Sequence, residues 1–305
     1  MANFELTTSI FTLSELQQTD ISPFDAIYLG DPFCRAYYQN LGENKPDLKK
    51  AIDFLRAKGK KVYVSTYAVP RNDDLPATEN LLNWCDEFEV DAIEVHNFGT
   101  LRIARNKHPN LDIFVGYLAN IYTELTVTRL KKLGVSRIMG NYELSLEELE
   151  TIRKSCDIDV EILLHGKMVL GISENCFLRQ RLGLEEKDCM DMCRREYQLV
   201  STRMLLRTFG RVTLSGKDVC MIEHLPEVLS KGFKIFRIES FAESRDYAGK
   251  VAPVYRRALK KAGDGEKYNP YEFLPELQKI SRANFCNGYY FSTSGQEYVT
   301  SSQRS

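Results

Sequence analysis

Short runs of apolar and β-branched residues recur along most of this chain. They are found at residues 26–30, 61–69, 92–99, 112–119, 137–144, 160–168, 211–216 and 234–240. Near-continuous hydrophobicity of this kind is typical of parallel strands that are buried on both faces. The pattern therefore predicts eight strands of a parallel sheet.

Charged amphipathic stretches with helix start and stop signals separate these runs. Residues 46–59 begin with Pro46 and end at Gly59, and residues 145–156 open with the capping-box pair Ser145 and Glu148. Residues 218–232 are expected to form the helix after the seventh strand. The alternation predicts an α/β fold, a TIM-like (β/α)8 barrel. An open doubly wound sheet would show the same alternation, but eight regularly spaced strands fit closure better.

Two intervals interrupt the alternation and predict the domain organisation. Residues 169–210 separate the sixth predicted strand from the seventh, and residues 263–305 follow the last barrel helix. We expect a barrel domain over residues 1–262 that carries a cysteine-bearing insertion, 169–210, after strand 6. Residues 263–305 are expected to be an extension that packs on the barrel and ends in a loose polar tail.

Composition excludes several classes of protein. The chain has 305 residues, 43% of them hydrophobic, and a net charge of −1, so it can bury a large core and shows no global preference for nucleic acid or anionic membranes. The first ten residues have neither a basic start nor a long apolar run, which argues against a secretory signal. No stretch approaches the roughly 18 apolar residues of a membrane span. We expect a cytoplasmic protein.

The eight cysteines are many for a protein of a reducing compartment, where clustered cysteines indicate metal binding or catalysis. Loops that follow the strands form the functional face of such barrels. Cys34 follows the first predicted strand, and Cys176, Cys189 and Cys193 lie in the insertion. Cys189 and Cys193 are spaced i, i+4, so one helical turn would point both thiols the same way. We expect these four thiolates to hold a metal centre.

Two alternatives concern this centre. Zinc and a [4Fe–4S] cluster both accept four thiolates, but structural zinc sites usually contain close Cys-x2-Cys pairs, which this chain lacks. The scattered ligands favour the cluster, with zinc as the alternative. Cys220, expected early in the helix after the seventh strand, is an alternative fourth ligand. Cys85 and Cys156 are expected to be small buried residues of helices.

Further polar residues are expected at the same rim of the barrel. His96, Asn141, His165 and Glu239 close or follow predicted strands, and Arg179 and Arg194 lie in the insertion. We take His165 and Glu239 as catalytic candidates, and Arg179, Arg194, His96 and Asn141 as substrate-binding candidates. Arginines suit a carboxylate-rich substrate or an RNA backbone. Histidines that shape loops and solvated loop charges are the alternatives.

Several ordered motifs resemble the collagenase-like peptidase family U-32, over about residues 25–290. His165 and Gly166 match the His-Gly that follows an acidic strand in that family. The matches continue at Cys176, Cys189, Cys193, Arg194, Lys217, Asp218, Cys220 and Glu239. One of the cysteines of the usual pattern would fall at Val169, and Cys34 can replace it. This arrangement looks like the UbiV branch of the family.

The resemblance implies a function. UbiV works in a heterodimer with a second family member, UbiU, and each carries a [4Fe–4S] cluster. Together they hydroxylate ubiquinone precursors without oxygen, with prephenate implied as the hydroxyl source. Other members hydroxylate tRNA or ribosomal RNA. The family name also implies a peptidase, but the chain has no Gly-x-Ser-x-Gly or His-Glu-x-x-His motif. A cysteine nucleophile paired with His165 stays open.

Overall fold

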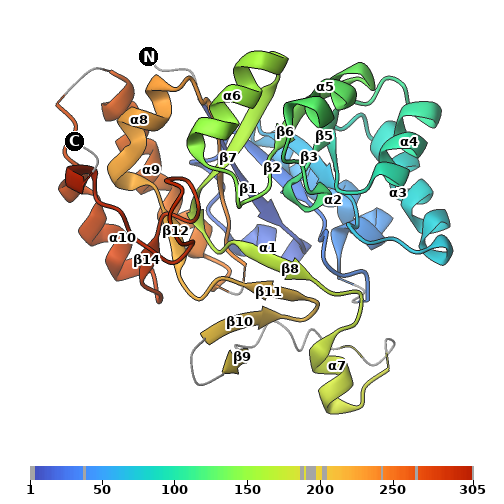
Figure 1. Ribbon diagram of the computed structural model, residues 1–305. Helices are drawn as coiled ribbons and strands as arrows, with labels where there is room; N and C mark the ends of the chain where they lie inside the picture. Colours follow the sequence, from blue (N-terminus) through green and yellow to red (C-terminus); the bar gives the residue numbers. More distant parts are fainter. Residues whose placement is uncertain are drawn as a thin grey trace.

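The computed structural model describes residues 4–36, 39–185, 189, 197–200, 205–241, 243–264 and 267–303, with the backbone alone for 197–200 and 205–209. Within these residues a ring of parallel strands forms a closed barrel (Figure 1). Its members are β1 (Glu5–Ile10), β2 (Ala26–Leu29), β3 (Lys61–Ser65), β4 (Ala92–Val95), β5 (Ile113–Val115), β6 (Val135–Met139), β7 (Asp159–Gly166) and β13 (Ile235–Ile238). Strand β13 pairs with both β7 and β1, which closes the ring. The predicted TIM-like (β/α)8 barrel is confirmed.

The barrel includes a strand that the hydrophobic pattern missed. Strand β1 reads ELTTSI, and its hydroxyl groups face carboxylates inside the barrel, with Thr7 donating to Glu161 (2.6 Å) and Ser9 to Glu239 (3.1 Å). An inward face of hydroxyls leaves no apolar run to recognise. The predicted seventh strand, residues 211–216, instead contributes to a separate sheet. The insertion therefore follows the seventh barrel strand and not the sixth.

Helices surround the barrel and connect its strands (Figure 1). They are α1 (Leu13–Gln18), α2 (Lys45–Ala57), α3 (Leu75–Glu87), α4 (Phe98–Lys107), α5 (Glu124–Lys132), α6 (Leu146–Cys156), α8 (Leu225–Ser230) and α9 (Tyr247–Gly263). The predicted helices at 46–59 and 145–156 are confirmed as α2 and α6, and the Ser145–Glu148 capping box is present. Among the described residues, no helix is both long enough and apolar enough to cross a membrane.

The helix predicted over residues 218–232 was wrong in its first half. Strand β12 (Asp218–Cys220) opens that half and pairs antiparallel with the end of β7, and a short 3-10 helix (Ile222–His224) follows it. Helix α8 begins only at Leu225, with Pro226 in its first turn. Cross-strand pairing of Cys220 with His165 overrides the local helical pattern, because the backbone groups of β12 bond to a strand already in place.

Strands of the insertion, together with β11 just after it, form a second, antiparallel sheet that lies beside the barrel (Figure 1). Its strands, in spatial order, are β8 (Val169–Ile172), β11 (Val212–Leu214), β10 (Leu205–Phe209) and β9 (Tyr197–Val200). Helix α7 (Phe177–Leu182) follows β8 and carries Cys176 as its N-cap residue. The described part of the insertion therefore lies against the rim of the barrel.

The C-terminal residues contact the barrel through backbone and side chains. Helix α10 (Leu274–Ile280) is followed by β14 (Phe285–Cys286), which pairs with β12. The Tyr290 hydroxyl accepts from the backbone N–H of Leu163 (2.9 Å) and donates to its carbonyl (3.0 Å). Leu277 and Cys286 are fully buried. These contacts fasten the segment to β7.

Candidate metal centre

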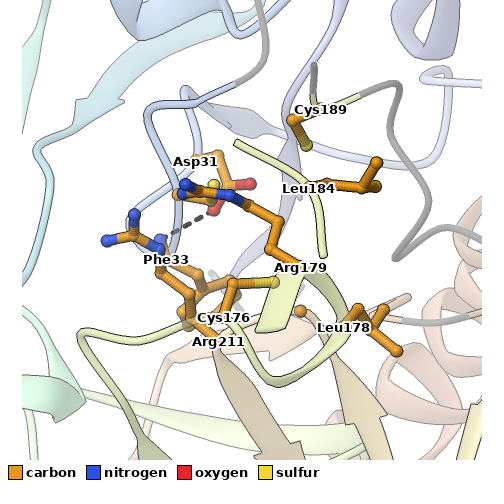
Figure 2. A pocket seen from close by; sticks show the side chains of 10 residues that line it. Asp31, Phe33, Cys176, Leu178, Arg179, Leu184, Cys189 and Arg211 are labelled. Carbon is orange, nitrogen blue, oxygen red and sulfur yellow. Dashed lines mark hydrogen bonds between the residues drawn. The ribbon is translucent and has the colours of Figure 1, made fainter. Parts of the chain in front are cut away.

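One pocket collects three of the predicted cysteine ligands at the C-terminal end of the barrel strands (Figure 2). The residues that line it are Asp31, Phe33, Cys34, Cys176, Leu178, Arg179, Leu184, Cys189, Gly210 and Arg211. The loop after β2 supplies Cys34, while the insertion supplies Cys176 and Cys189. The loop after β2 and the insertion, which are far apart in the sequence, thus lie at one pocket, as their positions after barrel strands predicted. Cys193 and Arg194 lie outside the described residues.

Local hydrogen bonds hold the loop that carries Cys34. The Asp31 carboxylate accepts from the backbone N–H of Phe33 (2.7 Å), and the Asn40 side chain accepts from the N–H of Asp31 (3.1 Å). The same Asn40 side chain donates to the carbonyl of Cys34 (3.0 Å). Asparagine and aspartate stabilise turns in this way because their short side chains reach nearby backbone groups. The thiol is therefore presented by a braced loop.

The electrostatics of Cys34 bear on metal binding. Burial, with the neighbouring Asp31 carboxylate, raises the pKa of the Cys34 thiol to about 12, while the Arg211 guanidinium opposes the rise. The free thiol is therefore protonated at neutral pH. Metal coordination needs the thiolate, so a bound cation would have to supply the positive charge that replaces this proton.

The donor set fits an iron–sulfur cluster. Three soft sulfur donors line one pocket whose other walls include the apolar Phe33, Leu178 and Leu184. Among the described residues, no three His, Cys, Asp or Glu side chains are close enough together to hold a single metal ion. Arg179 and Arg211 face the same pocket and would offset the negative charge of thiolates.

Other cysteines lie elsewhere. Cys220 is fully buried in β12, where its sulfur accepts from the Tyr255 hydroxyl (3.6 Å), and it does not line the pocket. Cys85 and Cys156 are buried in α3 and α6, as predicted. Cys34, Cys176 and Cys189 therefore line the pocket, whereas Cys85, Cys156 and Cys220 do not.

His165 belongs to a buried hydrogen-bond network and not to the pocket. Its Nε2 lies 2.8 Å from the hydroxyl of Tyr247 and its Nδ1 lies 3.2 Å from that of Tyr255. Tyr247 in turn donates to Asp218 (2.9 Å), which forms an ion pair with buried Lys167. Burial lowers the pKa of His165 to about 4, against the opposing Asp218 charge. Both ring nitrogens are engaged, so this histidine ties β7 to α9 and β12.

Gly166, the partner of His165 in the motif, has a steric role. Its φ of 116° favours glycine, and a Cβ there would lie 2.1 Å from the carbonyl oxygen of Glu239. The His-Gly pair thus allows β7 and β13 to approach closely at the rim. Both residues of the motif have structural explanations.

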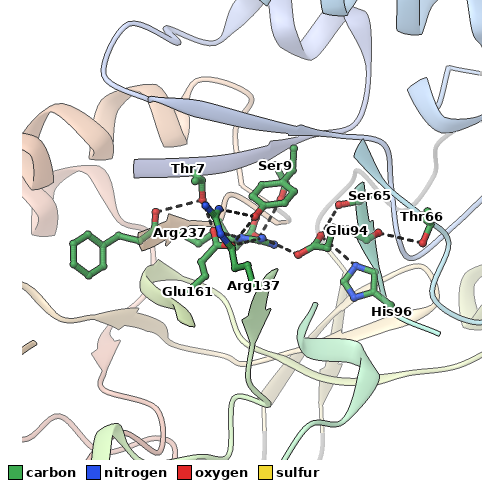
Figure 3. Close-up of polar contacts among 12 residues, drawn as sticks. Thr7, Ser9, Ser65, Thr66, Glu94, His96, Arg137, Glu161 and Arg237 are labelled. Atoms are coloured by element: carbon green, nitrogen blue, oxygen red, sulfur yellow. Dashed lines mark hydrogen bonds and ion pairs between the residues drawn. The ribbon is translucent and has the colours of Figure 1, made fainter. Parts of the chain in front are cut away.

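Charged side chains fill the interior of the barrel (Figure 3). Arg237 donates two hydrogen bonds of 3.0 Å to Glu161 and one of 2.8 Å to Glu94. Its guanidinium also lies 3.8 Å from the ring centre of Tyr28. Burial alone would raise the pKa of Glu94, but Arg237 and His96 hold it well below its usual value. Arg237, Glu94 and Glu161 were not among the predicted site residues, although a charge in the middle of an apolar strand is a visible signal in the sequence.

Glu239 directly follows β13 and His96 directly follows β4, so both lie at the C-terminal end of the barrel strands. Ser9 donates to one carboxyl oxygen of Glu239, and the other oxygen has no hydrogen-bond partner among the described residues. Burial raises the pKa of Glu239 to about 8, although Arg237 opposes the rise, so this carboxyl is mostly protonated at neutral pH. His96 Nε2 lies 3.3 Å from Glu94. Both residues are buried, and neither lines the cysteine pocket.

Of the remaining predicted residues, Asn141 lies in the loop after β6 and Arg179 lies at the cysteine pocket. Asn141 donates to the side chain of Asn120 (3.1 Å) and accepts from the N–H of Glu143 (3.0 Å), which shapes the loop after β6. Arg179 faces the cysteine pocket from α7 (Figure 2). The structure thus brings Arg179 together with the three cysteines and leaves Asn141, His96, His165 and Glu239 apart from them.

Comparisons with known proteins identify relatives of this chain. A protein of Methanocaldococcus jannaschii described as an uncharacterized protease is 32% identical over 282 residues, which is 88% of this chain and 68% of that protein. The tRNA hydroxylation protein P of Haemophilus influenzae is 24% identical over 327 residues, which is 90% of this chain and 71% of that protein.

A solved structure has a similar fold, and a family model matches most of the chain. A Ruminococcus gnavus sialic acid aldolase has a similar structure, with a TM-score of 0.52 and 10% identity over 91% of this chain and 77% of the aldolase, which supports the barrel fold alone. The model of peptidase family U32 matches residues 13–300. This chain therefore belongs to peptidase family U32.

Proposed function

We propose that the pocket of Cys34, Cys176 and Cys189 holds a [4Fe–4S] cluster, and that the chain takes part in an oxygen-independent hydroxylation of tRNA. The observation that carries the proposal is the meeting of three thiols from two distant segments at one pocket. Cys193 is the expected fourth ligand. A bound cluster would supply electron transfer or a Lewis-acidic iron.

The residues of the pocket have distinct roles in this proposal. Cys34 would hold the cluster as a thiolate, and coordination would replace the proton of its thiol, because burial raises the pKa of that thiol to about 12. Arg179 and Arg211 offset the negative charge of the thiolates. Phe33, Leu178 and Leu184 limit the access of water to the sulfur atoms. The pocket is therefore suited to a buried anionic centre.

The choice of tRNA as substrate rests on a relative. The Haemophilus influenzae protein named for tRNA hydroxylation matches 90% of this chain. A second candidate is hydroxylation of a ubiquinone precursor, with prephenate as hydroxyl source and a UbiU-like partner in a heterodimer. The position of Cys34 favours this candidate. In the UbiV arrangement a cysteine after the first predicted strand replaces the one that the usual family pattern has at Val169. Here Cys34 lines the pocket, and Val169 lies in β8.

A peptidase is less well supported by the geometry. The Methanocaldococcus jannaschii relative is described as an uncharacterized protease. In this chain the ring nitrogens of His165 contact two tyrosine hydroxyls, and His165 is not among the residues that line the cysteine pocket. A nucleophilic cysteine needs a base within hydrogen-bonding reach of its thiol. The three thiols therefore suit metal ligation better than nucleophilic catalysis.

Anaerobic purification followed by iron and sulfide analysis tests the cluster. We expect about four irons and four sulfides per chain. Cys34→Ala should lose most of the iron, while Cys220→Ala, a matched substitution outside the pocket, should keep it. One equivalent of zinc without sulfide would contradict the proposal. Full iron in Cys34→Ala together with its loss in Cys220→Ala would move the fourth ligand to Cys220.

Binding measurements separate the two substrates. If tRNA is the substrate, the intact protein should bind it with an affinity that falls steeply as salt rises, because counterions are released from the phosphates. Absence of tRNA binding, with co-purification of a second family member and a bound quinone precursor, would favour the ubiquinone candidate. Cleavage of a denatured protein by the metal-free chain would instead support the peptidase.

A further inference from the structure

We infer that a groove between helices α5 and α6 binds an amphipathic segment of a partner protein, one that carries Lys or Arg beside apolar side chains. The two helices follow the neighbouring barrel strands β5 and β6 and lie side by side (Figure 1). The groove encloses about 930 Å³, counting the part open to solvent, and shares no residue with the cysteine pocket. It is therefore independent of the proposed cluster.

An exposed apolar surface forms part of the groove. Leu125, in the first turn of α5, is 85% exposed, more than any other large apolar side chain of the described residues. Tyr122, just before α5, is 41% exposed and lines the same groove, and the buried Ile152 of α6 completes the apolar lining. Large apolar side chains that are exposed together at one groove mark an interaction site, unlike the single ones scattered over most protein surfaces.

The charge of the groove is negative. Glu124, Glu147 and Glu148 line it, and its described lining contains no Lys or Arg. Glu143 lies next to these residues, because its carboxylate accepts from the hydroxyl of Tyr122 (2.7 Å). In the part of the chain that the structure describes, none of the four carboxylates forms an ion pair. Their charge is therefore available to cations of another molecule.

A paired carboxylate on the same helix shows how the groove differs. Glu150, further along α6, forms ion pairs with Lys154 and with Lys231, the latter at 3.0 Å. Helix dipoles favour acidic residues in the first turns of α5 and α6. They do not account for Glu143, which lies outside both helices, or for an exposed leucine in a first turn. A partner that covers the groove accounts for both.

The negative charge decides between occupants. RNA and anionic membrane surfaces are themselves negative, so the groove would repel them. A symmetric dimer through the groove would bring the carboxylates of two copies against each other. A basic amphipathic segment matches both parts of the surface, because its apolar side chains can cover Leu125 and Tyr122 while its cations pair with the carboxylates.

Peptide binding to the intact protein tests the chemistry of the groove. Fluorescence anisotropy is measured with a short amphipathic peptide of Leu and Lys, and with the same peptide carrying Glu in place of Lys. The Lys peptide should bind and the Glu peptide should not. Leu125→Ser should weaken binding of the Lys peptide about tenfold, because the burial of a leucine side chain is lost. Glu147→Lys should also weaken it and should reduce its dependence on salt.

Leu133→Ser and Glu87→Lys are the matched controls. Leu133 is an exposed leucine at the other end of α5, Glu87 is an exposed glutamate of α3, and neither lines the groove. Both variants should bind the Lys peptide as the wild type does. Absence of Lys-peptide binding, equal binding of the Glu peptide, or a Leu125→Ser variant that binds no worse than Leu133→Ser would overturn the assignment.

Photo-crosslinking in cells identifies the natural occupant. The full chain is produced with the photoreactive residue p-benzoylphenylalanine in place of Leu125, and the crosslinked segment is sequenced by mass spectrometry. We expect a segment of a different protein with Lys or Arg beside apolar residues, and loss of the crosslink when Glu147→Lys is added. A crosslink to a second copy of this chain, to RNA or to lipid, or no crosslink at all, would contradict the proposed occupant.

Discussion

The barrel interior and the cysteine pocket use polar residues in opposite ways. Inside the barrel, Arg237 is bonded to Glu94 and Glu161 on strands far apart in the sequence. In the pocket, Cys34, Cys176 and Cys189 face a common space from loops of the barrel and the insertion. A polar group whose bonds are made within the fold contributes to the stability and uniqueness of that fold. A set of groups that face one space is available to a ligand.

The position of a residue at the end of a strand is by itself a poor guide to its function. His165 and Cys34 both lie at or just beyond the end of a barrel strand, yet His165 is bonded to two tyrosines and Cys34 lines the pocket. Position brings a residue to the rim, but the neighbours of its side chain decide what that residue can bind.

The largest expected effect is the loss of stability when the interior network is broken. Arg237→Met would leave the carboxylates of Glu94 and Glu161 buried without their cation, at a cost of about 3–5 kcal/mol in the free energy of unfolding. Urea denaturation measures this cost. Arg257→Gln, which breaks an exposed pair, should change the free energy by less than about 1 kcal/mol. Equal small losses in both variants would remove the distinction between interior and surface.

A second prediction concerns the pH dependence that Glu239 confers. Its pKa of about 8 in the folded state lies above its ordinary value of 4.5, so the folded protein keeps a proton that the unfolded chain releases. The stabilisation from this group is therefore complete below about pH 4.5 and declines until about pH 8. Relative to Glu239→Gln, which does not titrate, the wild type should lose roughly 2–4 kcal/mol across this window. Urea titrations at several pH values test it, and parallel curves for the two proteins would refute the buried acid.

The smallest expected effect on stability is in the pocket. Cys176 is half-buried at the start of α7, so Cys176→Ser should change the free energy of unfolding of the metal-free chain by no more than about 0.5 kcal/mol. The same substitution should remove most of the iron from the anaerobically purified protein. Cys85→Ala should lower the free energy of unfolding by about 1 kcal/mol, because Cys85 is fully buried in α3. This variant should keep its iron, because Cys85 does not line the pocket. A large loss of stability in Cys176→Ser would show that this thiol has a structural role.

Part of the fold could be predicted because its signals are local. Strands β2 to β7 and β13 coincide with apolar runs, and the cap of α6 is encoded by Ser145 and Glu148. Strand β1 was missed because its inward residues are hydroxylated and are matched to carboxylates across the barrel. Residues 218–220 were misassigned because their pairing with β7 depends on a strand more than fifty residues earlier.

The sequence by itself determined the alternation of strands and helices, the helix caps and the supply of cysteines at strand ends. Only the tertiary structure decided that β1 closes the barrel and that Cys34 lines one pocket with Cys176 and Cys189. It also decided that His165 is satisfied by Tyr247 and Tyr255. The physical reason is range: caps and periodicity act over a few residues, whereas the bonding of a buried polar group depends on whichever distant segment the closed barrel places beside it.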